Sequence, residues 1–456
     1  MNNSKILLLI IALIIISYQL QGQNYQQKSL NVTVYNSNLG VVKDTRTIEL
    51  NKGVSEIKVT NVAEKIDPTS VHFKFNGSVL EQNFQYDLIS MSKILKKYLD
   101  QKIQILDEKG NFIEGTLLTT SSDQIVLKKN DGGLILLPNI AKYQINVGNL
   151  PEGLITKPTL IWLIDSKKSG KQDIELSYHT EGMNWHAEYV AILNENDTKA
   201  DLNAWVSVDN QSGTTFKDAN LKLVAGDVNR VSDDIMFRRG GYNKDIAPVQ
   251  TYREGDFEEK AFFEYHIYNL QRPVTLANNE TKQIALFETS NISIIKKFIF
   301  YDWGNNVEKG KVSVVVEFEN TKQNNLGVPM PKGKVRLNKS DGNTIEFIGE
   351  DIIEHTPKDE KIKLKVGEAF DVVVEEKVLE SKSVTDRVRE VTYELKIKNR
   401  KEQDIDVEVQ RNLYTNWEIL DTTHKYEKKD AMTVIFNVPI LKGKEVTLKY
   451  KVRWIF

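Results

Sequence analysis

The sequence predicts a mainly β protein, in which several immunoglobulin-like β-sandwich domains carry a small Sm-like or SH3-like barrel inserted in the N-terminal part. Two observations lead to this prediction. Apolar and polar residues alternate with a period of two in many short segments, as in strands with one buried and one wet face. Turn residues separate these segments at intervals of roughly 8–12 residues, the spacing of sandwich strands. Convincing helical periodicity occurs in one place, residues 90–100.

The first 22 residues have the parts of a secretory signal peptide. Lys5 is their only charge, and residues 6–16 form an unbroken apolar run. That run is shorter than the roughly 20 residues that span a bilayer, so a cleaved signal is favoured over an uncleaved membrane anchor. Small Gly22 can precede the cut, which would leave Gln23 first. We expect an exported protein of the periplasm, the outer-membrane surface or the extracellular space, without a transmembrane helix once the signal is removed.

The mature chain is predicted to divide into four parts. Residues 23–89 are part of an N-terminal sandwich, 90–147 the small barrel, 148–300 a central sandwich and 301–456 a C-terminal sandwich region. In the barrel, Met91, Ile94, Leu95, Tyr98 and Leu99 recur at helical spacing. Five short strands are predicted after this helix, over residues 102–106, 112–119, 124–128, 134–137 and 143–147.

Two patterns near the carboxyl terminus predict specific strands. Apolar residues alternate over 391–397 and again over 405–409, which predicts an antiparallel hairpin with its turn at 399–403. A last strand is predicted to bury one face, made of Val446, Leu448, Tyr450, Val452, Trp454 and Phe456. In contrast, residues 227–259 are the weakest in the chain for regular structure, and we interpret them as a long loop.

Composition excludes several classes of chemistry. The chain has 456 residues and no cysteine, which excludes disulfides, thiolate nucleophiles and thiolate metal sites. Its 61 Lys+Arg and 63 Asp+Glu give a net charge of −2, which argues against a nucleic-acid partner. No His-Glu-x-x-His or Gly-x-Ser-x-Gly motif is present. We therefore assign no catalytic, cofactor-binding or metal-binding residue, and no cofactor.

Three groups of residues come closest to the pattern of a metal-binding or ligand-binding site. His179 and His186 are seven residues apart and would need a turn at Gly182 to meet, so we expect His179 on a solvated face. Oxygen ligands for calcium cluster at 194–201 and at 227–234, but neither loop has the full EF-hand spacing. Both are interpreted as turns capped by Asn and Asp side chains. The six tryptophans are interpreted as core residues, since exposed ones at loop tips would instead suggest carbohydrate stacking.

Several segments resemble a known family. Residues 182–189 have the pattern Gly-x-x-Trp-x-x-x-Tyr, and blocks at 204–223, 263–266 and 327–333 are similar to further family segments. Together they resemble the exported bacterial family called domain of unknown function 4139, which has mucoidy-inhibitor-like relatives; the signal and turn usage are similar to those of Bacteroidetes members. The resemblance covers roughly residues 30–456. Many relatives carry a coiled-coil insert where this chain has the predicted barrel. The family implies no established activity and therefore no catalytic residues.

The leading functional hypothesis is an exported, non-catalytic cell-envelope interaction or scaffold protein. Its partner would be another envelope protein or a surface glycan, bound by sandwich loops and strand edges. Two alternatives stay open: a hydrolase of envelope glycan with unidentified acidic residues, and an adhesin-type component associated with the outer membrane. A deep pocket with converging carboxylates would favour the hydrolase, whereas a surface with exposed strand edges would favour binding.

Overall fold

The computed structural model describes residues 26–121, 124–151, 154–226, 257–262, 265–304, 306–414 and 416–456. The predicted signal peptide (residues 1–22) and its cleavage site lie outside the described residues. The described strands form five sheets, so the mainly β class is confirmed. The immunoglobulin-like and Sm-like or SH3-like character of the parts, and their boundaries, stay predictions. Within the described residues, no helix is both long and apolar enough to cross a bilayer.

Three sheets share one continuous core. The N-terminal sheet has the order β16-β17-β15-β1-β2-β12-β4, with β18 also paired to β15. Its strands are β1 (Gln26–Tyr35), β2 (Leu39–Leu50), β4 (His72–Lys74), β12 (Gly170–Thr180), β15 (Phe216–Ala225), β16 (Phe257–Phe262), β17 (Tyr265–Leu270) and β18 (Val274–Leu276). A three-stranded sheet, β3-β11-β5, contains β3 (Gly53–Thr60), β11 (Thr159–Ser166) and β5 (Gly77–Gln85). The central sheet, β19-β14-β13-β22-β23, contains β13 (Met183–Leu193), β14 (Lys199–Asn210), β19 (Glu280–Ser293), β22 (Gly333–Ser340) and β23 (Ile345–Ile353).

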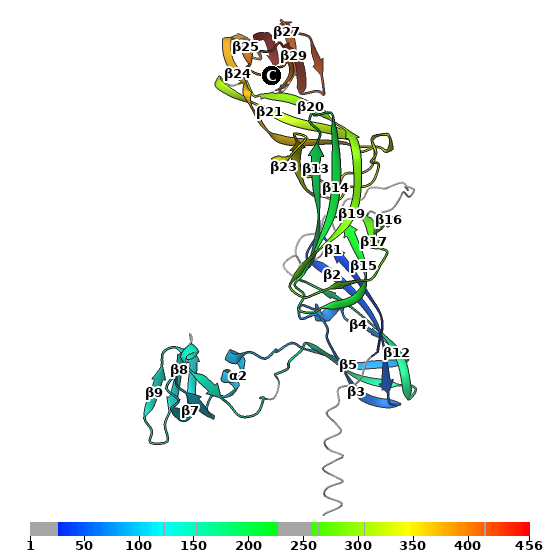
Figure 1. Ribbon diagram of the computed structural model, residues 1–456, viewed down its shortest axis with the longest axis vertical. Helices are drawn as coiled ribbons and strands as arrows, with labels where there is room; N and C mark the ends of the chain where they lie inside the picture. The colour runs from blue at the N-terminus through cyan, green and yellow to red at the C-terminus, as the bar shows by residue number, and fades with distance from the viewer. Residues whose placement is uncertain are drawn as a thin grey trace, which may run out of the picture.

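The C-terminal sheet has the order β27-β30-β25-β24-β21-β20-β26-β29-β28 and encloses a second core. Its strands are β20 (Ile295–Asp302), β21 (Val307–Glu319), β24 (Lys361–Thr385), β25 (Val388–Asn399), β26 (Ile405–Asn412), β27 (Asn416–Thr422), β28 (Tyr426–Lys428), β29 (Thr433–Ile440) and β30 (Glu445–Ile455). β21 and β24 contribute to both cores, because Phe318 and Leu364 belong to the first and Val312 and Val374 to the second. These two strands therefore tie the C-terminal sheet to the body at one end of an elongated molecule (Figure 1).

The small module stands to one side of the body in Figure 1. It consists of α2 (Met91–Lys97) and a sheet of order β10-β6-β7-β8-β9, with strands β6 (Lys102–Leu106), β7 (Phe112–Ser121), β8 (Gln124–Lys128), β9 (Leu134–Leu137) and β10 (Gln144–Asn146). The predicted helix and five strands are thus confirmed, with α2 capped by the Ser90 side chain. The buried residues of the module form a cluster of their own, around Leu95, Ile105 and Leu127.

The predicted hairpin over 391–409 is wrong. β25 pairs with β24 and β30, whereas β26 pairs with β20 and β29, so the two strands do not pair with each other. Their apolar faces instead line the same core. The buried Asn399 side chain lies at the end of β25, where its Nδ2 donates to the carbonyls of Ile440 and Leu441, each at 3.2 Å. It fixes the end of β25 beside the end of β29.

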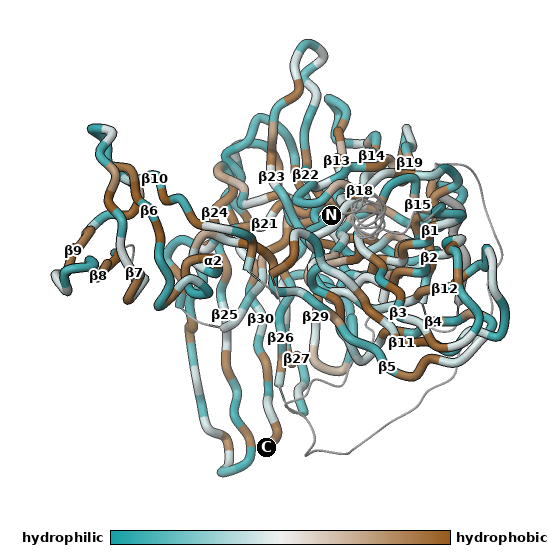
Figure 2. The backbone as a smooth tube through the Cα atoms, turned by 90° about the horizontal axis from the view of Figure 1, so that it is seen from below, coloured by the Kyte–Doolittle hydropathy of each residue, from teal (hydrophilic) through white to brown (hydrophobic). Residues whose placement is uncertain are grey.

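Two further expectations are corrected near the chain's C-terminal half. β30 buries Leu448, Tyr450 and Val452 as predicted, but Phe456 beyond its end is 65% exposed. The strand lies between β25 and β27, and the C-terminus lies beside the projecting end of the β24–β25 hairpin (Figure 2). The segment 227–259, expected to lack regular structure, ends in β16 from residue 257, while residues 227–256 lie outside the described part.

Candidate functional site

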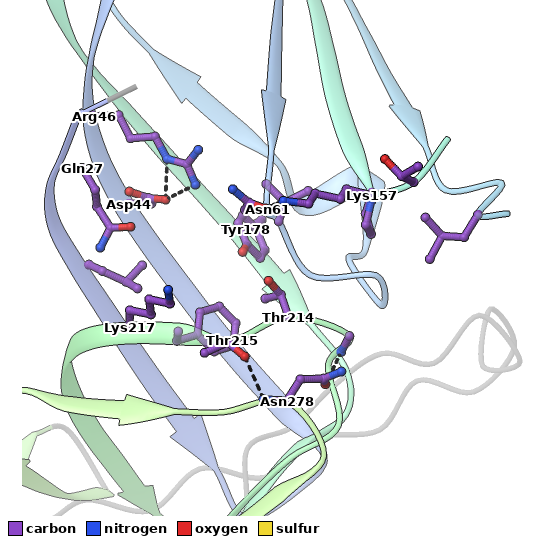
Figure 3. A pocket seen from close by; sticks show the side chains of 17 residues that line it. Gln27, Asp44, Arg46, Asn61, Lys157, Tyr178, Thr214, Thr215, Lys217 and Asn278 are labelled. Carbon is purple, nitrogen blue, oxygen red and sulfur yellow. Dashed lines mark hydrogen bonds and ion pairs between the residues drawn. The ribbon is translucent and has the colours of Figure 1, made fainter. Parts of the chain in front are cut away.

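A polar cavity of about 630 Å³ lies against the N-terminal sheet. β1, β2, β12 and β15 supply one side of it, and the loops at 61–62, 156–158, 213–217 and 278 supply the rest. Figure 3 shows the Asp44–Arg46 pair on one side, Asn61, Tyr178 and Lys157 across from it, and Lys217 below. We call this space the Asp44–Arg46 cavity.

Asp44 and Arg46 form a buried ion pair in the wall of the cavity. Arg46 Nε and Nη2 both reach Asp44 Oδ2, at 2.8 and 2.7 Å, and Arg46 Nη1 donates to the carbonyl of Thr60 at 3.2 Å. The two side chains are only 4% and 7% exposed. They occupy positions of β2 that share the core-facing side with Val42 and Ile48. Because burying two charges is costly, their place on a face of β2 that is otherwise apolar marks this strand as specialised.

Tyr178 supports the same wall from the neighbouring strand β12. It is fully buried next to the ion pair, and burial raises the pKa of its phenol, opposed by a hydrogen bond from the Ala63 backbone. The phenol therefore stays neutral at physiological pH. Asp44 Oδ1 is buried and has no hydrogen-bond partner among the described residues, and Arg46 is the described cation that pairs with this carboxylate.

The rim of the cavity is cationic. Lys157 donates to Asn61 Oδ1 at 3.0 Å, and Lys217 is exposed, with no ion pair to any described residue. Together with Arg46, the described residues of the lining hold three cationic side chains against one carboxylate, that of Asp44. Since Asp44 already pairs with Arg46, the two lysines give this part of the lining a net positive charge. Such a site attracts a carboxylate or phosphate group.

The cavity also lies at the root of the small module. Leu88 and Thr156 line it, and they belong to the two segments that lead to α2 and return from β10. These segments run side by side: Leu88 bridges Ile155, and Ile89 N donates to Ile155 O at 3.0 Å. Both connections to the small module therefore border the cavity.

A second buried charge cluster lies in the C-terminal core. Asp302 Oδ1 lies 2.5 Å from Arg411 Nη1, Asp302 Oδ2 accepts from the Tyr450 hydroxyl, and Glu376 Oε1 lies 4.0 Å from Arg411. Burial, and then the nearby Asp302 carboxylate, raise the pKa of Glu376 to about 8. Asp302 and Glu376 are neighbouring carboxyl groups, but both are almost completely buried. Asp302 lines a small cavity beside Trp303, but Arg411 and Tyr450 hold its carboxylate, and Glu376 does not line that cavity. The two carboxyl groups therefore do not flank an open cleft of the kind that glycoside hydrolysis requires.

The histidines that the sequence suggested as possible site residues do not come together in the structure. His179 faces solvent on β12, as predicted, while His186 lies on β13 near Glu188 and Asp209, at 3.9 and 4.0 Å. Between the two strands the chain turns at Gly182, whose φ of +79° and close approach to the Gln211 carbonyl leave no space for a Cβ. In the described part of the chain, no three metal-binding side chains gather.

The first calcium candidate, at 194–201, is a capped turn. Asn194 Oδ1 accepts from the backbone N–H groups of Thr198 and Lys199, which confirms the turn interpretation. The Asp197 carboxylate is held by Lys296 and Lys339 at 2.7 and 2.5 Å. Partial burial favours a higher pKa for Asp197, but the two lysines outweigh it and lower the pKa overall. The second candidate, at 227–234, lies outside the described residues.

The tryptophans divide between core and surface. Trp162 and Trp185 are buried, Trp417 and Trp454 pack at the edge of the C-terminal core, and Trp205 and Trp303 are 41% and 63% exposed. The core interpretation is therefore wrong for these last two. The family-like block at 182–189 serves packing: Trp185 Nε1 donates to Val224 O at 3.0 Å, and the Tyr189 hydroxyl donates to Pro331 O at 2.7 Å.

Comparison with known families agrees with this framework. A model of the family described as "Domain of unknown function (DUF4139)" matches residues 174–454, more than half of the 456 residues. The match covers the central and C-terminal sheets and the β12 strand that carries Tyr178. A search of curated proteins gives no match. On the strength of the family match, this chain belongs to the DUF4139 family.

Proposed function

We propose that the protein is an exported, non-catalytic cell-envelope interaction protein that binds an anionic group of its partner in the Asp44–Arg46 cavity. The partner is another envelope protein or a surface glycan that carries carboxylate or phosphate groups. The signal peptide predicted in residues 1–22 supports the location, and the small module supports a scaffold role, because its two connections border the cavity.

The main support for this proposal is the positive charge at the rim of the cavity. Its rim presents Lys157 and Lys217, while Asp44 in the wall is already bound by Arg46. A bound anion would therefore meet two ammonium groups together with the hydroxyl and amide groups of Thr214, Thr215 and Asn278. These groups orient a ligand by hydrogen bonds and charge, which is the usual construction of a binding site.

The same charges favour binding over hydrolysis. Hydrolysis of a glycosidic bond requires two carboxyl groups on either side of the bond, one of which can donate a proton. Asp44 is the one carboxylate among the described residues of the cavity lining, and it is already paired with Arg46. The lining can therefore hold an anion but does not supply an acid and base pair.

Sedimentation with washed envelope material tests the proposal. The mature protein should sediment with this material at low ionic strength, and Lys217→Glu should sharply reduce the bound fraction, because it places a like charge against the anion. Lys171→Glu is the matched control: Lys171 is an exposed lysine of β12 that does not line the cavity. Equal retention of both variants would contradict the proposed site. Steady release of soluble glycan fragments by the wild type would favour a hydrolase instead.

Export itself has a separate test. Amino-terminal analysis of the protein recovered from the envelope should show Gln23, or its cyclised form, as the first residue. An intact Met1 on protein that stays embedded in the membrane would show an uncleaved anchor.

A further inference from the structure

A second, smaller cavity lies on the outer face of the C-terminal sheet. It has a volume of about 180 Å³ and is formed where β20, β26 and β29 end. Tyr301 and Gln410 lie opposite each other in the parallel β20–β26 pair, and Asn412 lies opposite Thr433 in the β26–β29 pair. All four residues line the cavity together with Trp303. We call it the Trp303 cavity.

Two exposed aromatic rings form its apolar side. Trp303 is 63% exposed and Tyr301 is 45% exposed, whereas Trp162 and Trp185 are almost completely buried in the main core. Tyr301 and Trp303 are two positions apart at the end of β20, with Asp302 between them, and both side chains line the same cavity. A pair of large aromatic side chains left in water beside a cavity is a typical surface for a ligand with one apolar face.

The buried charge cluster holds this aromatic surface in place. Asp302 lies between the two aromatic residues, and its Oδ1 accepts a hydrogen bond from Gly304 N at 2.9 Å. The same carboxylate is fixed by Arg411 and Tyr450. Gly304 has a φ of +72°, and a Cβ there would lie 2.0 Å from Arg411 Nη2, so only glycine lets the turn approach the guanidinium so closely. The turn that carries Trp303 is thus fixed before any ligand arrives.

Polar groups complete the cavity opposite the rings. The Gln410 amide donates one hydrogen bond to Glu408 and keeps its carbonyl oxygen as an acceptor. Asn412 Oδ1 is buried without a hydrogen-bond partner among the described residues. Lys429 adds a cationic donor at the rim. An exposed aromatic face combined with amide groups and an ammonium matches a molecule that has an apolar face and a ring of hydroxyls.

We propose that the Trp303 cavity binds a single pyranose ring of a glycan. The apolar face of the sugar stacks on Trp303, and its hydroxyls bond to the Gln410 and Asn412 amides. The volume supports one ring rather than a longer oligosaccharide, because it lies below the roughly 300–1,000 Å³ of pockets that enclose drug-sized ligands. This site shares no residue with the Asp44–Arg46 cavity and does not depend on the function proposed for it.

Saturation-transfer NMR on the full mature protein tests the site. The probes are soluble oligosaccharides of glucose, galactose, mannose, N-acetylglucosamine and glucuronate, each titrated to obtain a dissociation constant. At least one probe should bind, and Trp303→Ala should weaken that binding tenfold or more. Trp303→Phe should restore part of the loss, because a smaller aromatic face remains. Trp205→Ala, at the other exposed tryptophan, and Lys217→Glu, in the Asp44–Arg46 cavity, should both bind like the wild type.

Three results would overturn the proposal. One is the absence of binding by every probe of the panel. Another is wild-type affinity in Trp303→Ala when its circular dichroism and melting curve are unchanged. The third is an equal loss in Trp205→Ala, which would place the sugar elsewhere. Failure of the envelope proposal leaves this test unaffected, because Lys217→Glu reports on the first cavity alone.

Discussion

Glu376 provides a quantitative test of the buried charge cluster. Its side chain is 1% exposed, and it faces Asp302, Arg411, Tyr393 and Tyr450 in the C-terminal core. Burial, with the Asp302 carboxylate as the second cause, raises the pKa of Glu376 to about 8 from its ordinary 4.5, and Arg411 only partly opposes the shift. Glu376 is therefore protonated in the folded protein at neutral pH.

The sign of the pH effect follows from this shift. Well below pH 4.5 the carboxyl is protonated in both states, so its contribution to stability is fully present. As pH rises, the unfolded chain ionises first, and the contribution is lost progressively until the folded-state pKa is reached. One pKa unit corresponds to about 1.4 kcal/mol, so Glu376 should lower the free energy of unfolding by about 3 kcal/mol between pH 5 and pH 8. That is a large part of a domain's typical stability of about 5–15 kcal/mol.

Glu376→Gln isolates this contribution, because glutamine resembles the protonated acid and does not titrate. Unfolding by urea is followed at pH 5 and pH 8 by hydrogen exchange in peptides from β25 and β30, which report on the C-terminal core. The variant should match the wild type at pH 5 and be more stable at pH 8. Glu427→Gln, at an exposed position of β28, is the control and should behave like the wild type at both values. If the free energy of unfolding differs between Glu376→Gln and wild type by the same amount at pH 5 and at pH 8, the reasoning is refuted.

Three further predictions concern stability. Replacing residues 90–147 with a short Gly/Ser bridge should leave the thermal unfolding of the remaining sheets cooperative, because the small module has its own core; loss of that transition would show a shared one. Removing residues 450–456 should unfold the C-terminal sheet, since Tyr450 and Val452 are fully buried between β25 and β27; an unchanged melting curve would show a dispensable tail. Arg46→Met should destabilise the protein by about 3–5 kcal/mol in urea titrations, because Asp44 is left buried without its counter-ion, and Asp44→Asn in the same chain should restore part of the loss. If the urea midpoint of Arg46→Met equals that of the wild type, Asp44 has another partner that compensates its charge.

Local patterns predicted the strands well but not their partners. The bounds of β6, β8 and β9 follow from alternation and turn residues, since both are properties of neighbouring residues in the sequence. The relation between β25 and β26 does not follow from these patterns. Two strands that pair and two strands that face each other across a core show the same alternation. Contacts between distant residues accompany the arrangement seen here. Asn399, for example, bonds to residues about 40 positions further along the chain.

The buried charges of both candidate sites are visible in the sequence as interruptions of the apolar alternation. Asp44 and Arg46 stand at positions of the same parity as buried Val42 and Ile48, and Arg411 follows buried Val409 in the same way. A charge at a core position of a strand could therefore have identified both clusters. The Asp44–Arg46 cavity itself could not have been found this way, because Tyr178 and Lys217 come to line it through the pairing of β2 with β12 and of β1 with parallel β15.

Salt dependence of envelope binding tests the central claim most directly. The fraction of mature protein bound to washed envelope material is measured across a series of salt concentrations, for the wild type and for Lys217→Glu. If the lysine rim of the Asp44–Arg46 cavity holds an anionic group, wild-type binding should fall steeply as salt rises, because added ions screen the exposed lysines. Lys217→Glu should bind weakly throughout, with a shallower dependence. Strong binding by both proteins with the same salt dependence would contradict the claim.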